Sequence, residues 1–533
     1  MNLSKRFADT TAGFSTKGGK NAPYGGEEPA LPTLTIISHP NPERIGERVF
    51  MEDTGEEKPW PISRGAPDFQ IPGKLLGRPL EDPFLSRKPF FLTLKSGGVL
   101  TMDVSKTRTE VVVAGRRVEG ASRFPLHLLK RGIPLTLADR IVLLLHLSRN
   151  TCRPQGGDFG LIGAGDSICH LREEIRRVAD LAVPVLLRGP SGTGKELVAQ
   201  AIHEAGAKGK PFISVNLGAI PPGLAATALF GAKRGSFTGA DRDQLGYFLS
   251  AAGGTLFLDE VGEAPPEVQA MLLRALETGE IHPVGAPVPR KVKVRLIAAT
   301  DADLEAMMAR DTFKIPLFHR LAGYEIRLAP LCERLDDLGR LLIHFARGEL
   351  AQTGEVFRLR LRDPYDTPWL PPGLINDFLE FHWPGNIRQL RNTVRQLIIG
   401  SRGNHQLVAP PQIREMLAQK PAPAEGAKTR KPSAARPKKR KPSQIPEADV
   451  HEALQAHGWD IKASAAALGI SRGTLYLLLE KWPGLRKAID LNEDEIRAGL
   501  LQSHGDPAKA AERFRVSPRA LKRRMHQLGI KLS

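Results

Sequence analysis

The sequence predicts a multidomain chain that joins an all-β sandwich, an α/β domain with a helical extension, and a small all-α domain. Short β-branched runs separated by Gly and Pro, the pattern of a sandwich, occur between residues 31 and 150. Strands then alternate with helical patterns from 158 to 328, which is typical of an α/β domain. A linker rich in Lys and Pro at 418–445 precedes a helical segment, 446–533, that contains an internal repeat. The 533 residues are enough for three or four domains of about 150 residues each.

Composition narrows the classes of partner. The chain has 76 Lys and Arg against 58 Asp and Glu, a net charge of +18, which favours an anionic partner such as nucleic acid, nucleotide or acidic lipid. No stretch approaches the roughly 20 apolar residues that span a bilayer. The N-terminus also lacks the basic-then-apolar order of a signal peptide. We therefore expect a cytoplasmic protein with no membrane association.

The N-terminal region divides into an arm and a β-rich domain. Residues 1–30 are rich in Gly, Lys and Thr with almost no large apolar side chain, which predicts a disordered arm. Residues 31–150 carry the apolar runs expected of sandwich strands. These runs are Leu34–Ile37, Phe90–Leu94, Val99–Val104, Glu110–Val113 and Ile141–Leu145.

A glycine-rich turn lies between a buried-strand pattern, Val183–Arg188, and a helical pattern, Leu197–His203. Glycines allow backbone N–H groups to converge on a phosphate, and the helix N-terminus adds positive potential. Lys195 supplies a point charge for the β- and γ-phosphates. The turn predicts a nucleotide site formed by Gly189, Pro190, Ser191, Gly192, Thr193, Gly194, Lys195 and Glu196, the last standing where Ser or Thr is usual.

A second apolar strand, Gly254–Leu258, ends in two carboxylates about 65 residues downstream. Asp259 is positioned to hold Mg²⁺, and Glu260 to orient or deprotonate the attacking water. Paired acids at a strand end can also be a solvated cap. Together with the phosphate loop, however, they indicate an ATPase that uses ATP and Mg²⁺.

The segment after Leu229-Phe230-Gly231 resembles a surface loop of the bacterial enhancer-binding proteins, the NtrC-like AAA+ activators of sigma-54 RNA polymerase. The resemblance covers 158–400 and continues through Val294–Thr300, Phe313–Leu321 and Trp383–Arg388. It implies an AAA+ core at 158–328, a helical lid at 329–400, and a homo-oligomeric ring of six or seven subunits that remodels the closed promoter complex. It also implies a sigma-54 contact made by Gly235, Ser236, Phe237, Thr238, Gly239 and Ala240.

The same resemblance assigns further roles in ATP hydrolysis. Asn216 corresponds to a polar residue that restrains the catalytic glutamate, Thr300 lies in the sensor I segment, and Arg388 corresponds to the sensor II arginine of the lid. Arg320 corresponds to one of two arginine fingers that act on a neighbouring subunit's nucleotide. The other finger position is Lys314, which keeps the charge but lacks the planar fork of arginine. We therefore expect hydrolysis, weakened at the subunit interface.

The C-terminal segment Ile461–Tyr476 resembles the Fis-like helix-turn-helix of the same family. Its turn and recognition helix would contact an upstream activator sequence in double-stranded DNA. A second copy lies 46 residues further on, and its alternative interpretation is a plain helical hairpin with a charged surface. The expected DNA contacts are Ser471, Arg472, Gly473, Thr474 and Tyr476 in the first copy and Arg519, Lys522 and Arg523 in the second.

The β-rich region 31–150 resembles a forkhead-associated (FHA) domain, which binds phosphothreonine proteins. Ile62–Gly65 resembles its first loop and Leu85–Arg87 its second, so Arg64, Ser86 and Arg87 would hold the phosphate by charge-assisted hydrogen bonds. The usual histidine after the Ser-Arg pair is absent, and Ala114-Gly115 replaces the customary Asn-Gly. A generic sandwich that binds no phosphopeptide remains the alternative.

These expectations combine into a sigma-54-dependent activator with a β-sandwich sensor, an ATP-driven ring and a DNA-binding tail. One alternative is a DNA-binding regulator with weak or lost ATPase activity, acting as a repressor or scaffold. A second is an AAA+ chaperone or helicase, which fits the nucleotide motifs but neither the sigma-54 loop nor the tail.

Overall fold

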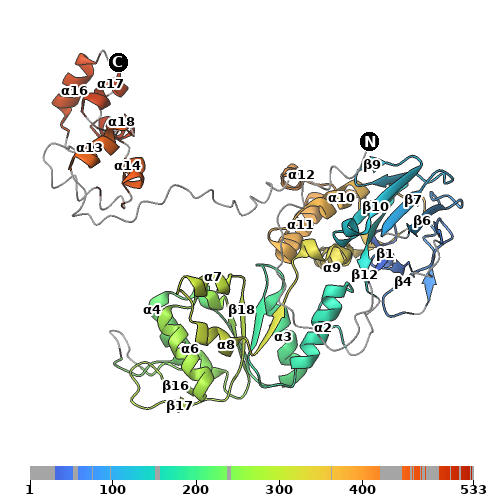
Figure 1. Ribbon diagram of the computed structural model, residues 1–533, viewed down its shortest axis with the longest axis horizontal. Coiled ribbons are helices and arrows are strands. Elements are labelled where there is room, and N and C mark those ends of the chain that lie inside the picture. The colour runs from blue at the N-terminus through green and yellow to red at the C-terminus, as the bar shows by residue number, and fades with distance from the viewer. Residues whose placement is uncertain are drawn as a thin grey trace. The chain divides into compact units, whose positions relative to one another are not determined.

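A computed structural model describes most of the chain (Figure 1). The described residues are 30–51, 58–74, 76–95, 98–149, 157–236, 242–361, 363–419, 447–456, 459, 461–468, 470, 475, 491–503, 506–514, 516, 518–528 and 530. The chain divides into two compact units, with the boundary at Ala422–Pro423. The predicted arm, the linker and the tip of the sigma-54 loop lie outside the described residues. Among the described residues, no helix is long and apolar enough to cross a membrane.

The N-terminal domain consists of antiparallel strands in two sheets, as predicted. The first sheet has the order β5-β4-β2-β1-β12-β11-β8-β9 and the second β10-β7-β6-β3. Side chains from both sheets form one core, which includes Leu34, Phe90, Leu100 and Phe124. The strands of the first sheet are β1 (Leu31–Ser38), β2 (Arg48–Phe50), β4 (Phe69–Gln70), β5 (Gly77–Arg78), β8 (Val111–Val113), β9 (Arg116–Arg117), β11 (Ile133–Leu137) and β12 (Ile141–Ser148); those of the second are β3 (Trp60–Ile62), β6 (Phe90–Lys95), β7 (Val99–Asp103) and β10 (Ala121–Pro125), with short 3₁₀ turns η1 (Pro42–Arg44) and η2 (Leu126–Lys130).

The α/β part is built on a parallel five-stranded sheet of order β14-β15-β18-β13-β19. Parallel sheets are covered by helices on both faces, so their strands are almost continuously apolar. The strands are β13 (Val185–Arg188), β14 (Phe212–Asn216), β15 (Thr255–Asp259), β18 (Arg295–Thr300) and β19 (Tyr324–Arg327); the helices are α2 (Asp166–Val178), α3 (Lys195–Ala207), α4 (Pro222–Phe230), α5 (Tyr247–Ser250), α6 (Pro266–Thr278), α7 (Leu304–Ala309) and α8 (Ile315–Leu321), with the hairpin β16 (Glu280–Ile281) and β17 (Arg290–Lys291).

The helical lid follows the last strand. Its helices are α9 (Leu338–Gln352), α10 (Pro372–Glu380), α11 (Asn386–Gly400) and α12 (Pro411–Ala418). They share a core around Trp383, Leu342 and Leu397.

The lid core also contains residues of the β-domain. Ile37, Val142 and Leu144 belong to it, whereas their strand neighbours Ile36 and Leu143 belong to the sandwich core. Because successive side chains of a strand face opposite sides, β1 and β12 are buried on both faces. The β-domain and the lid therefore pack together through a continuous apolar contact within the first unit.

Every regular element among the described residues of the C-terminal unit is a helix. They are α13 (Glu447–Ala456), α14 (Ile461–Ala467), α16 (Glu493–Gln502), α17 (Pro507–Arg513) and α18 (Pro518–Gln527). Two separate cores hold them, one with Val450, Leu454 and Leu475 and the other with Ile496 and Leu521.

Candidate functional site

The phosphate loop has the predicted position between β13 and α3. Gly192 and Gly194 have φ angles of 79° and 100°, a region that favours glycine. A Cβ on Gly192 would lie 2.4 Å from the carbonyl oxygen of Gly385, so the loop and the lid approach each other too closely for any other residue. The Lys195 Nζ donates to the carbonyl oxygen of Gly189 at 2.8 Å, and burial lowers the pKa of Lys195. A partly buried ammonium beside a glycine-rich loop at the start of a helix suits the phosphates of a nucleotide.

The acidic residues lie on the neighbouring strands. The register pairs Asn216 of β14 with Asp259 of β15, and Glu260 follows at a left-handed φ of 54°. A Cβ on Gly218 would meet the Glu260 Oε2 at 2.2 Å and the Asn216 Oδ1 at 3.3 Å, so these two side chains flank the same glycine. The Asn216 Oδ1 accepts from the Ala219 N–H at 3.1 Å. The predicted catalytic glutamate and its restraining asparagine thus lie side by side.

Asp301, which follows Thr300 where the family commonly has Asn, was given no role by the sequence. Of the acids that act on Lys195, Asp301 is the strongest, ahead of Asp259 and Glu260. It follows Thr300, whose carbonyl oxygen accepts from the Gly189 N–H at 3.3 Å. Because β18 lies between β15 and β13, the carboxyl end of β18 brings Asp301 to the phosphate loop. The sequence signal that could have identified Asp301 was its position as a polar residue directly after β18, the buried strand next to β13.

The lid contacts the phosphate loop through the start of α11. Asn386 Nδ2 donates to the Ser191 carbonyl oxygen at 2.9 Å, and the Ile387 N–H donates to the Gly192 carbonyl oxygen at 3.0 Å. The guanidinium of Arg388 donates to the Ser191 hydroxyl at 3.3 Å. Arg388 therefore lies at the nucleotide site, and Asn386, to which the sequence assigned no role, bridges lid and loop.

Lys314 immediately precedes α8 and Arg320 lies on it, and both residues contact α6. Arg320 is more than half exposed and pairs with Glu277 of α6 at 3.5 Å. The backbone N–H of Lys314 donates to the Gln269 side chain of the same helix at 2.9 Å. Among the described residues, neither Lys314 nor Arg320 forms a hydrogen bond or an ion pair with the phosphate loop of its own chain.

The base of the predicted sigma-54 loop is closed by main-chain and ionic contacts. Ala232 and Gln244 exchange two backbone hydrogen bonds, of 3.1 and 2.8 Å. Lys233 pairs with Asp243, which also accepts from the Arg234 N–H. Of the predicted contact residues, Gly235 and Ser236 are described at this base, whereas Phe237, Thr238, Gly239 and Ala240 lie outside the described residues.

Three loops of the β-domain meet around the predicted phosphothreonine residues. The Arg64 N–H donates to the Ser86 carbonyl oxygen at 3.1 Å, and the Ser86 N–H donates to the Thr109 hydroxyl at 2.8 Å. The Ser86 hydroxyl accepts from the Lys88 N–H at 3.0 Å, and Arg87 is exposed. Thr109 belongs to a loop that the sequence argument did not include.

The β-domain loop that holds Ser86 also contacts the lid. Asp82 and Arg140 form a buried ion pair at 2.9 Å, and the Arg140 guanidinium donates to the carbonyl oxygens of Pro364 and Asp366. The Phe84 ring lies under the same guanidinium and packs edge-on against Tyr365. The candidate phosphopeptide loop is thus joined to the lid by charged and aromatic contacts.

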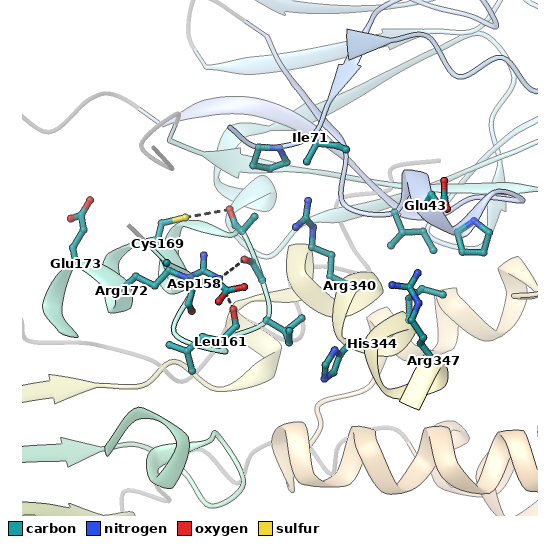
Figure 2. A pocket seen from close by; sticks show the side chains of 18 of the residues that line it. Glu43, Ile71, Asp158, Leu161, Cys169, Arg172, Glu173, Arg340, His344 and Arg347 are labelled. Carbon is teal, nitrogen blue, oxygen red and sulfur yellow. Dashed lines mark hydrogen bonds between the residues drawn. The ribbon is translucent and has the colours of Figure 1, made fainter. Parts of the chain in front are cut away.

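A cavity of about 600 Å³ lies where the β-domain, α2 and α9 meet (Figure 2). Figure 2 shows Arg340, His344 and Arg347 of α9 on one side and Arg172 of α2 on another. The Arg340 guanidinium lies so close to Gly46 that a Cβ there would be 2.0 Å from its Nε. No residue of the phosphate loop lines this cavity, which is therefore separate from the nucleotide site.

The DNA-binding residues are described only in part. Ser471, Arg472, Gly473, Thr474 and Tyr476 lie outside the described residues. Arg519, Lys522 and Arg523 lie on α18, where the side chains of Lys522 and Arg523 are exposed. The second copy is therefore the better described of the two.

Three family models match the chain. Residues 161–327 match the sigma-54 interaction domain, 333–429 the AAA+ ATPase lid domain, and 450–482 the bacterial regulatory protein Fis family. These matches begin after the β-domain, whose FHA character stays a prediction.

Curated relatives agree with these matches. The hydrogenase transcriptional regulatory protein HoxA of Bradyrhizobium diazoefficiens is 38% identical over 58% of this chain and 62% of its own length. The DNA-binding transcriptional regulator NtrC of Salmonella typhimurium is 41% identical over 48% and 52%, and the transcriptional regulatory protein ZraR of Escherichia coli is 34% identical over 61% and 69%. The chain thus spans between half and about two thirds of the length of these relatives. With its phosphate loop, lid contact and helical tail, the chain belongs to the sigma-54-dependent, NtrC-like family of transcriptional regulators.

Proposed function

We propose that the protein is a transcriptional activator that hydrolyses ATP to remodel the closed complex of sigma-54 RNA polymerase. The observation that carries this proposal is the convergence of three elements on the phosphate loop. Lys195 lies within it, Asp259 and Glu260 end a strand of the same sheet, and Arg388 reaches Ser191 from the lid. All the parts needed to bind a nucleotide and to respond to its γ-phosphate are therefore present in one chain.

The residues fit a magnesium nucleotide. Backbone N–H groups of the loop and Lys195 would hold the phosphates, and Asp259 would hold Mg²⁺, which supplies charge neutralisation for the transferring phosphoryl group. Glu260 would orient the attacking water, and Asn216 beside it would restrain that carboxylate until the nucleotide is positioned. In a homo-oligomeric ring of six or seven subunits, Arg320 and Lys314 would act on the neighbour's nucleotide.

The loop above Ala232 and Gln244 is the proposed contact with sigma-54. Two backbone hydrogen bonds between Ala232 and Gln244 fix the base from which this contact would be made. The Fis-type segment would bind the upstream activator sequence, and the basic linker would add salt-dependent attraction to phosphates. Together these parts link an upstream DNA site to promoter opening.

The β-domain is the proposed sensor of a phosphothreonine protein. Arg64, Ser86 and Thr109 lie in contacting loops, and the adjoining Asp82 pairs with Arg140, which binds the lid segment at Pro364. This chain of contacts supports a route by which phosphopeptide occupancy changes the position of the lid, and with it Arg388.

The deciding experiment is ATP-dependent open-complex formation with sigma-54 holoenzyme. Wild-type protein should form open complexes with ATP, whereas Lys195→Ala and Glu260→Gln should form none. Glu263→Gln is the matched control, because Glu263 is an exposed carboxylate three residues away. Equal activity of Glu260→Gln and Glu263→Gln would contradict the assigned role of Glu260.

A second candidate function is a DNA-binding regulator whose ATPase is weak or lost. Lys314 favours it, because a lysine cannot make the bidentate contact of an arginine finger. DNA binding without measurable ATP turnover or open-complex formation at saturating protein would support this candidate instead.

A further inference from the structure

Among the described residues of the C-terminal unit, a pair of helices occurs twice at a fixed offset. Helices α13 and α14 begin and end at residues that lie 46 positions before the ends of α16 and α17. The Fis family match covers 450–482, which is the first of these arrangements only. Residues 491–530 thus form a second three-helix module outside that match, with α18 as its last helix.

Hydrogen bonds in the two turns repeat at the same offset. In the first turn, Leu468 N–H donates to the Ser464 carbonyl oxygen and Ile470 N–H to that of Ala465, both at 3.0 Å. In the second, Phe514 N–H donates to the Ala510 carbonyl oxygen and Val516 N–H to that of Ala511, again both at 3.0 Å. These pairs correspond position by position, so the turn that sets the angle between two helices is preserved.

The buried positions repeat as well. Val450, Leu454, Ala465 and Leu475 form the first core, and the residues 46 positions later, Ile496, Leu500, Ala511 and Leu521, are all buried in the second. The second module has additional support of its own. Asn492 and Glu495 form a capping box at the start of α16, and the Phe514 ring packs so close to Gly499 that a Cβ there would lie 2.1 Å from it.

Helix α18 divides into a buried face and a basic face. Leu521 and Met525 are buried, whereas Lys522, Arg523 and His526 are exposed. Arg524 is different, because its Nε donates to the Leu491 carbonyl oxygen at 3.1 Å and so helps to hold the helix in place. The exposed side of α18 therefore presents cationic groups while its other side is fixed to the module.

We propose that residues 491–530 form a second site for double-stranded DNA, with α18 as the helix that faces the duplex. In a helix-turn-helix the residues near the start of the last helix contact base edges. Lys522 stands 46 positions after Tyr476, and Arg519 after Gly473, both of which are expected contacts of the first copy. Because the residue types differ, the two modules read different sequences, and the chain binds a bipartite, asymmetric DNA site.

The test uses the full-length chain and a duplex selected from a random library by that chain. Affinity is measured across salt concentrations, and the complex is mapped by hydroxyl-radical footprinting. Lys522→Ala and Arg523→Ala should each reduce the slope of log K against log salt by about 1, since one phosphate contact contributes about 0.9. The double variant should also shorten the footprint at one end.

The matched control is Arg497→Ala, which removes one exposed positive charge from α16 of the same module, where Arg497 pairs with Glu493. It should leave slope and footprint unchanged. If the Lys522 and Arg523 variants show the same salt slope and footprint as Arg497→Ala, the proposal is overturned, even if the module binds RNA or a protein instead. Arg472→Ala in the first module separates failure of this proposal from failure of the proposed function. If Arg472→Ala weakens DNA binding while the Lys522 and Arg523 variants do not, the first module binds DNA and only the second site is refuted.

Discussion

Gly339, near the start of α9, shows how closely the β-domain is packed on the lid. A Cβ on this glycine would lie 2.3 Å from the Ile37 carbonyl oxygen and 2.7 Å from Ile45 Cγ2, both in the β-domain. Gly348, on the same helix, would meet nothing within 4 Å. The pair Gly339→Ala and Gly348→Ala therefore differs only in whether the new methyl group meets the β-domain.

The expected difference can be worked out from these distances. Alanine in a helix interior gains up to about 1 kcal/mol over glycine, and this gain is common to both variants. Overpacking a well-packed contact costs about 1–3 kcal/mol, and only Gly339→Ala bears that cost. Since 1.36 kcal/mol corresponds to tenfold, the contact should open about 5- to 150-fold more often in Gly339→Ala than in Gly348→Ala.

Native-state hydrogen exchange measures such local opening. Peptides from β1 and from the turn that contains Ile45 should exchange faster in Gly339→Ala by that factor, while peptides from β14 and β15 serve as internal controls. Equal exchange in the two variants would refute the reasoning, because it would mean that the lid and the β-domain do not hold this contact in solution.

Three further predictions concern the subunit interface, pH and the sensor. Lys314→Arg should raise ATP turnover at saturating protein, and unchanged turnover would show that the lysine does not limit hydrolysis. Burial lowers the pKa of His39 and His146 to about 3, so each makes the native state less stable as pH falls from 6.5 towards 3, because the unfolded chain binds a proton there that the folded chain does not. Asp336, whose pKa burial raises to about 7, acts in the opposite direction between pH 4 and 7. In urea unfolding, His146→Gln should lose less stability than the wild-type protein as pH falls below 6.5, and equal losses would contradict the role of His146. A phosphothreonine peptide should bind wild-type protein and not Arg64→Ala, whereas Arg116→Ala, an exposed arginine elsewhere on the β-domain, should bind normally; equal binding by all three would favour the generic sandwich.

Much of the architecture was predictable because its signals are local. A few neighbouring residues are enough to predict each of these elements, and the structure contains them where they were expected. Examples are the loop Gly189–Lys195, the strand that ends at Asp259 and the run Val99–Val104. The 46-residue repeat was also visible as a similarity of sequence. The sequence similarity could not show that the helices of the two copies end at corresponding residues, or that corresponding residues form the hydrogen bonds of the two turns.

Contacts between distant segments were less accessible. Asn386 joins the lid to Ser191 without any local signature of that role, and Asp301 approaches Lys195 from another strand, signalled only by its position directly after a buried strand. One signal of the β-domain contact was present in the sequence. Ile141–Leu145 is continuously apolar where a strand with one solvated face would alternate, and the lid covers its second face.

The sequence by itself determined the three classes of fold, the nucleotide motifs and the duplicated tail, because each depends on residue patterns that are close together in the chain. Only the tertiary structure decided that the β-domain lies against the lid and that α18 exposes Lys522 while Arg524 is held inside the module. The physical reason is that close packing and hydrogen bonding between remote segments depend on shapes that exist only after each element has folded. A glycine such as Gly339 is therefore an ordinary residue in the sequence and a point of close contact in the fold.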